Sequence, residues 1–159
     1  MTVNPKQSNT LILAVLEQGG KAICVGNLVT EWGMEQETII ATGASALAVT
    51  QTATADARII KARQIAIFSN SKPLVDLYTH PIRLPLRRPA DLDKHYNERG
   101  GEYRKGMWIT PAGYGATTDG QAEWEIMRNL CHFDRWQFRF VPIEQMKRTM
   151  ELWEDIYVR

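Results

Sequence analysis

Basic and aromatic residues between positions 82 and 110 are the part of this sequence best suited to hold a ligand. Residues 82–106 carry seven Lys and Arg against four Asp and Glu, a local net charge of +3. Guanidinium groups bind phosphates through paired hydrogen bonds, and aromatic rings stack on bases. The candidate nucleic-acid-binding residues are Arg83, Arg87, Arg88, Arg104, Lys105 and Trp108. A solvated loop whose mixed charges screen one another is the alternative explanation.

Acidic residues are too dispersed to predict a metal centre. A pair of divalent cations needs several carboxylate oxygens around it, as in nucleases that use two metal ions. The acidic residues near the ends of expected elements are Glu17, Asp56, Asp119 and Glu144. His80, His95 and His132 have no metal-ligand spacing. The sequence therefore predicts no catalytic residue, no metal and no cofactor.

Composition is that of a folded domain rather than a disordered or membrane-spanning chain. The chain has 159 residues, 44% hydrophobic and 23% charged, with a net charge of +1. These values predict a single domain over residues 1–159 with a polar tail at 1–10. The apolar run 11–16 is too short to span a membrane, so we expect a cytoplasmic protein. Cys24 and Cys131 are predicted to be buried thiols.

Hydrophobic periodicity divides the chain into strands and helices. A Gly-Gly turn after residue 18 predicts a hairpin, and the first strand is the most apolar, which favours a central place in the sheet. The expected strands are 11–17, 21–32, 37–41, 64–68 and 136–141. The expected helices are 45–63, 72–80, 121–133 with Asp119 as its N-cap, and 143–153. Residues 81–120 are predicted to be a long irregular excursion, and Trp124 and Trp153 to be buried on helical stripes.

This order of elements, β-β-β-α-β-α, then a basic excursion, then α-β-α, resembles ribonuclease H over nearly the whole chain. The segment IAIFSNSKPLV at 65–75 is similar to the family's fourth strand and following helix. The segment GMWIT at 106–110 is similar to the family's Trp-x-Thr segment. The resemblance implies an α/β fold with a ribonuclease H-like mixed sheet. An unrelated α+β sandwich is the alternative.

Ribonucleases of this family hold two divalent cations with four carboxylates, and the resemblance identifies the matching positions here. They lie on the first strand, the first helix, the end of the fourth strand and the last helix. The residues at these positions are Glu17, Ala48, Asn70 and Glu144. Two of the four are neutral, and Glu17 is expected to be out of register. Loss of these anions removes most of the charge that holds Mg²⁺.

We therefore expect a non-catalytic ribonuclease H-like domain that binds nucleic acid or another protein, with no membrane partner. One alternative is a metal-dependent nuclease with relocated carboxylates, drawn from Glu17, Asp56, Asp119 and Glu144. Another is a structural subunit that forms a homodimer through an exposed strand or the aromatic C-terminal helix.

Overall fold

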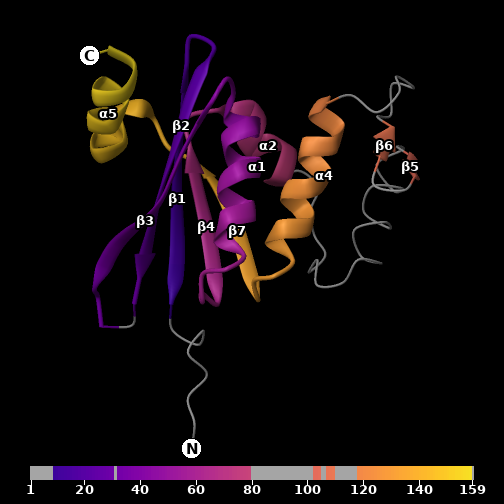
Figure 1. Ribbon diagram of the computed structural model, residues 1–159, viewed down its shortest axis with the longest axis horizontal. Coiled ribbons are helices and arrows are strands. Elements are labelled where there is room, and N and C mark those ends of the chain that lie inside the picture. Colours follow the sequence, from indigo (N-terminus) through magenta and orange to yellow (C-terminus); the bar gives the residue numbers. More distant parts are fainter. Residues whose placement is uncertain (1–8, 31, 80–101, 105–106, 110–117, 159) are drawn as a thin grey trace, which may run out of the picture.

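A five-stranded mixed sheet with helices on both faces forms the body of the protein (Figure 1). The computed structural model describes residues 9–30, 32–79, 102–104, 107–109 and 118–158. The strands of this sheet are β1 (Thr10–Gln18), β2 (Lys21–Val29), β3 (Glu35–Gly43), β4 (Gln64–Ser69) and β7 (Arg135–Phe140). The helices are α1 (Ala46–Ala57), α2 (Lys72–Thr79), α4 (Thr118–Leu130) and α5 (Lys147–Trp153). A 3₁₀ turn, η1 (Ile143–Gln145), precedes α5, and a π-helical turn, η2 (Glu154–Val158), follows it.

Strand β1 lies at the centre of the sheet, as its apolar sequence predicted. The order across the sheet is β3-β2-β1-β4-β7. β1 and β3 each pair antiparallel with β2, whereas β4 pairs parallel with both β1 and β7. Gly19 and Gly20 make the β1–β2 turn with φ of 58° and 77°, values that L side chains rarely adopt.

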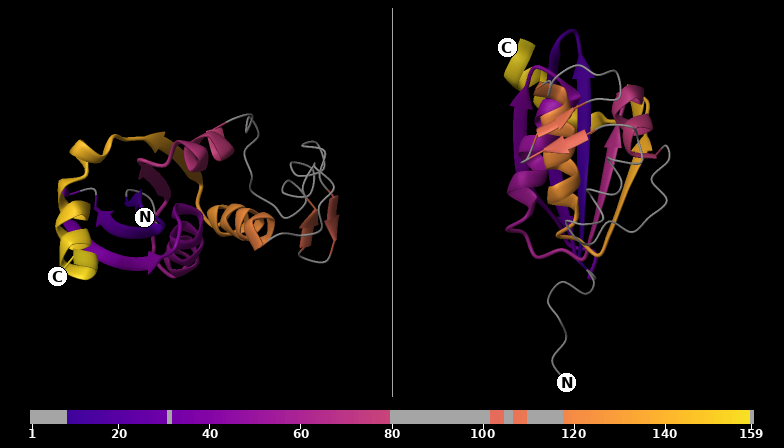
Figure 2. Two further views of the ribbon diagram at one scale, coloured as in Figure 1. Left: turned by 90° about the horizontal axis from the view of Figure 1, so that it is seen from above. Right: turned by 90° about the vertical axis from the view of Figure 1, so that its right-hand side faces the viewer.

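Helices lie against both faces of the sheet (Figure 2), and each face has its own hydrophobic core. Helices α1, α2 and α4 cover one face, where Leu11, Leu13 and Val15 of β1 point. Helix α5 covers part of the other face and buries Trp153 against Leu16 of β1. Alternation of side chains along β1 thus supplies both cores, because successive residues of a strand point to opposite faces.

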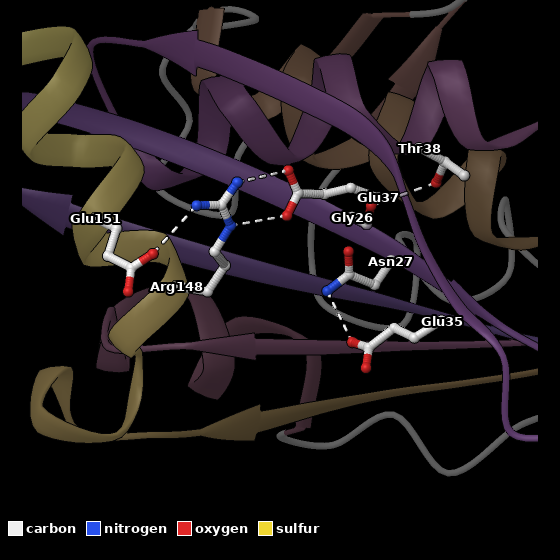
Figure 3. Close-up of polar contacts among 7 residues, drawn as sticks. All are labelled: Gly26, Asn27, Glu35, Glu37, Thr38, Arg148 and Glu151. Carbon is white, nitrogen blue, oxygen red and sulfur yellow. Dashed lines mark hydrogen bonds and ion pairs between the residues drawn. The ribbon is translucent and has the colours of Figure 1, made fainter.

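A β-bulge in β3 decides which residue meets α5. The pairing of β2 with β3 changes register between Gly26↔Ile39 and Asn27↔Glu37, which leaves Thr38 as the extra residue. The Thr38 hydroxyl donates to the Gly26 carbonyl at 3.3 Å. A bulge shifts the residues beyond it to the opposite face. Glu37 therefore faces α5, where it accepts two hydrogen bonds from Arg148 at 2.9 and 3.2 Å (Figure 3).

The element order predicted from the sequence is confirmed, with several corrections in detail. A two-stranded hairpin, β5 (Glu102–Arg104) and β6 (Met107–Ile109), lies within the range expected to be irregular, near α4. Helix α1 ends at Ala57, earlier than predicted. Helix α4 already begins at Thr118, so Asp119 lies in its first turn and is not its N-cap.

The side chains predicted to be buried fall into three groups: some are buried, one is only half-buried, and one is not described by the structure. Trp153 is 7% exposed, as expected, whereas the Trp124 side chain is among those that the structure does not describe. Cys24 is a buried thiol, as predicted, whereas the prediction for Cys131 was wrong in burial: it is a thiol but only half-buried. None of the described helices is long and apolar enough to cross a membrane.

Candidate functional site

Glu17 and Asn70, two of the four positions singled out by the sequence, are brought together where β1 and β4 end. The last paired residues of these strands are Val15 and Ser69. Beyond them, the Asn70 amide replaces a strand partner: Nδ2 donates to the Glu17 carbonyl and Oδ1 accepts from the Glu17 N–H, both at 2.9 Å. The side chain of Asn70 therefore continues the β-ladder by one residue.

The Glu17 carboxylate is bound to the start of helix α1. Its Oε2 accepts a hydrogen bond from the Ala46 N–H at 2.5 Å. Ser45 is the N-cap of the same helix, and its Oγ accepts from the Ala48 N–H at 3.1 Å. Two of the four N–H groups that a helix start leaves unpaired are thus satisfied. A carboxylate is favourable there because it also faces the positive end of the helix dipole.

A shallow groove of about 280 Å³ opens beside this pair. Glu17 and Ser45 line it from one side, and Ser71 and Pro73 line it from the start of α2. Glu123 of α4 is a second carboxylate in its wall. The sequence did not predict Glu123 as a site residue, because the periodic pattern of its helix is carried by the apolar residues.

The remaining acidic candidates lie elsewhere. Glu144 is exposed in η1 and lines a different groove, beside Glu151 and Glu154. Asp56 is exposed in the last turn of α1. Among the side chains that the structure describes, no three His, Cys, Asp or Glu residues are grouped so as to hold a metal ion.

Ala48, another of the four positions, takes part in capping helix α1 through its backbone. Ala48 is the third residue of α1, and its N–H donates to the N-cap Ser45. A half-buried methyl group at this position supplies no ligand for a cation. The first turn of α1 therefore brings backbone N–H groups and apolar side chains, but no carboxylate, to this end of the sheet.

The basic candidates fall mostly outside the described residues. Arg83, Arg87, Arg88 and Lys105 are not described. Arg104 is the last residue of β5, and Trp108 is the middle residue of β6, paired with Tyr103 through the backbone. The structure therefore leaves their proposed role in nucleic-acid binding as a prediction.

Comparison with known proteins gives the fold. No protein-family model and no curated protein sequence matches the chain. A solved structure of foamy viral protease-reverse transcriptase in complex with RNA/DNA hybrid matches 96% of the chain with a TM-score of 0.52 and 10% identity. The chain spans only 20% of that viral protein. The fold is ribonuclease H-like.

Two solved ribonucleases H also match, each over about the same length as this chain. The N-terminal ribonuclease H domain of a Mycobacterium tuberculosis protein, solved as a fusion with maltose-binding protein, is 13% identical, with 91% of both chains covered and a TM-score of 0.49. Ribonuclease H1 of the halophilic archaeon Halobacterium salinarum is 14% identical, with 91% of this chain and 92% of that chain covered and a TM-score of 0.46.

Proposed function

We propose that this ribonuclease H-like domain does not cleave nucleic acid and serves as a binding module for nucleic acid or a protein. The observation that carries the proposal is the bonding of Glu17 and Asn70. The Glu17 carboxylate caps α1, and both polar groups of the Asn70 amide are bonded to the Glu17 backbone. Asn70 thus offers a cation neither charge nor an unbonded polar group, and one oxygen of Glu17 is already bonded, whereas a two-metal nuclease surrounds its cations with several carboxylates.

Charge supports the same proposal. Asn70 and Ala48 are neutral, and Glu144 lies in another groove than Glu17. Mg²⁺ gives up its water reluctantly and is bound through carboxylates. The groove beside Glu17 holds two carboxylates, Glu17 and Glu123, and Glu17 already accepts a backbone hydrogen bond. Two carboxylates provide less charge than the four that hold the cations in a two-metal nuclease.

Thermal unfolding with and without divalent cations tests the loss of the metal site. At 1 mM, Mg²⁺ or Mn²⁺ should not raise the melting temperature relative to the same buffer with EDTA. A site with a Kd near 10 µM would add about 2.7 kcal/mol of stability, which such a measurement would detect. A clear upshift together with cleavage of an RNA/DNA hybrid would refute the proposal and favour relocated carboxylates.

Binding titrations at several salt concentrations test the partner. The salt dependence of binding counts the phosphate contacts. The logarithm of the association constant should fall with the logarithm of the salt concentration at a slope near −4, for duplex or single strands, if five residues contact phosphates. These residues are Arg83, Arg87, Arg88, Arg104 and Lys105. Replacing Arg87 and Arg88 by Ala should flatten the slope by about 1.5 to 2 without changing thermal stability. If no nucleic acid binds below about 100 µM at 50 mM salt, the partner is a protein.

A further inference from the structure

A second surface with ligand-binding character lies on the face of the sheet that α5 covers only in part. Helix α5 packs on β1 and β2. Beside it is a groove of about 330 Å³, whose apolar floor is formed by Ile12, Ala14, Val25 and Phe68. The start of α5 supplies the polar rim, with Lys147 and Arg148. The groove lies on the opposite face of the sheet from the Glu17 carboxylate, which points to α1.

Phe68 is the one aromatic side chain of this floor, and a cation lies next to it. Phe68 pairs with Arg139 in the register of β4 and β7. Paired residues of neighbouring strands point to the same face. Arg139 is exposed, whereas Phe68 is half-buried. Phe68 therefore has Arg139 at the paired position of β7, and it lines the same groove as Lys147.

The same face continues along β7 toward the start of the strand. Arg135 and Gln137 are exposed there and line another groove, of about 250 Å³. Arg135 and Arg139 are four residues apart, which corresponds to about 13 Å along a strand. Polar and basic side chains therefore extend from one groove to the other along β7.

The basic side chains on this face differ in whether an acidic side chain pairs with them. Arg148 is bonded to Glu37 and Glu151 (Figure 3), so it has little charge left for a ligand. Within the described part of the chain, Arg135, Arg139 and Lys147 form no ion pair. Lys147 also borders the groove that contains Glu144, Glu151 and Glu154. These carboxylates repel an anion from the outer side of α5 and leave the β4–β7 side as the favourable path.

We infer that the β4–β7 sheet face binds single-stranded nucleic acid, with a base against Phe68 and phosphates on Arg139 and Lys147. Bases stack on aromatic side chains exposed on a sheet, and basic residues beside them hold the backbone. A groove of about 330 Å³ is close to the lower limit for ligand pockets, about 300 Å³, which suits one unstacked base. This surface lies on the opposite face of the sheet from the Glu17 carboxylate. Its test substitutes none of the residues that test the proposed function, so the two can fail independently.

Fluorescence anisotropy with a labelled 12-residue oligo-dT, and with the duplex of the same length, tests the inference. Phe68→Leu keeps the floor apolar but removes the ring, and should weaken binding of the single strand about 5- to 10-fold. The double variant Arg139→Gln, Lys147→Gln should reduce the slope of log affinity against log salt concentration by about 1.4, because each phosphate contact with a single strand contributes about 0.7. Arg58→Gln, an exposed cation at the end of α1, is the matched control and should leave affinity within about twofold.

Photocrosslinking gives a measurement that does not depend on the folding of a variant. With a photoreactive uracil in the oligonucleotide, the adduct should fall on the tryptic peptide that begins at Gln64 and contains Phe68. Three results would overturn the inference. They are absence of single-strand binding at 50 mM salt, affinity unchanged by Phe68→Leu, and adducts confined to other peptides. If binding persists in these variants but is lost with Arg87 and Arg88, nucleic acid binds through the basic segment instead.

Discussion

Replacing Asn70 by Asp tests whether the amide at this position is required by the fold. Asp has nearly the same shape, but both its oxygens are acceptors when ionised. The hydrogen bond from Asn70 Nδ2 to the Glu17 carbonyl, 2.9 Å long, would be lost. A carboxylate oxygen would then face that carbonyl in a half-buried position.

The expected loss of stability follows from these two effects. The missing hydrogen bond is worth about 1 kcal/mol, and the unsatisfied polar groups add about 1 to 2 kcal/mol. Asn70→Asp should therefore lower the free energy of unfolding by about 2 to 3 kcal/mol at pH 7.5. The side-chain oxygen that accepts from the Glu17 N–H is retained, so the strand ends should stay in place.

The pH dependence distinguishes this explanation from simple loss of packing. The introduced carboxyl group, once protonated, would again donate to the Glu17 carbonyl, so its pKa in the folded variant should lie above that in the unfolded chain. The folded variant then binds more protons than the unfolded chain as pH falls. Its stability relative to wild type should recover as pH falls below the folded pKa and be lost as pH rises through it.

Urea unfolding followed by tryptophan fluorescence at pH 7.5 and pH 4.5 measures both effects. Asn9→Asp is the matched control: Asn9 Nδ2 also donates to a backbone carbonyl, that of Lys61, at 3.1 Å, but in an exposed contact. This control should lose about 0.5 kcal/mol or less. The reasoning would be refuted if the free energy of unfolding of Asn70→Asp lay within about 0.5 kcal/mol of wild type at pH 7.5. It would also be refuted if the variant were equally destabilised at both pH values.

Three further predictions concern the body of the fold. Trp153→Ala should cost about 3 to 5 kcal/mol in urea unfolding, because Trp153 is 7% exposed in the α5 core; a loss below about 1 kcal/mol would mean that this core is not packed. Burial raises the pKa of the Cys24 thiol to about 12, so iodoacetamide at pH 8 should alkylate half-buried Cys131 well before Cys24 in the native protein, with mass spectrometry as the readout. The hydrogen bond from Arg148 lowers the pKa of Glu37, so the ion pair should stabilise the fold at pH values above the ordinary carboxyl pKa. This stabilisation should be lost as pH falls through the lowered pKa. The free energy of unfolding of Glu37→Gln, measured against pH, should lack that change.

The sequence by itself determined the elements and their order. Glycines at 19 and 20 predict the first hairpin, and the apolar sequence of β1 predicts its central place in the sheet. These features are local, because turn conformation and hydrophobic periodicity depend on residues close along the chain. The same local reading placed the end of α1 and the start of α4 incorrectly, since helix ends depend on their tertiary contacts.

Only the tertiary structure decided what the candidate residues do. The sequence pointed to Glu17 and Asn70 separately, but their bonds join residues 53 positions apart and exist only because β1 and β4 pair in parallel. The bulge at Thr38 that turns Glu37 toward Arg148 left no recognisable sequence signal. Phe68 and Lys147 come from different elements, and the groove that they line follows from the position of α5 on the sheet. Arg139 lies beside Phe68 only because β4 and β7 pair in this register. Strand pairing and helix docking are set by burial over the whole chain, which no local pattern specifies.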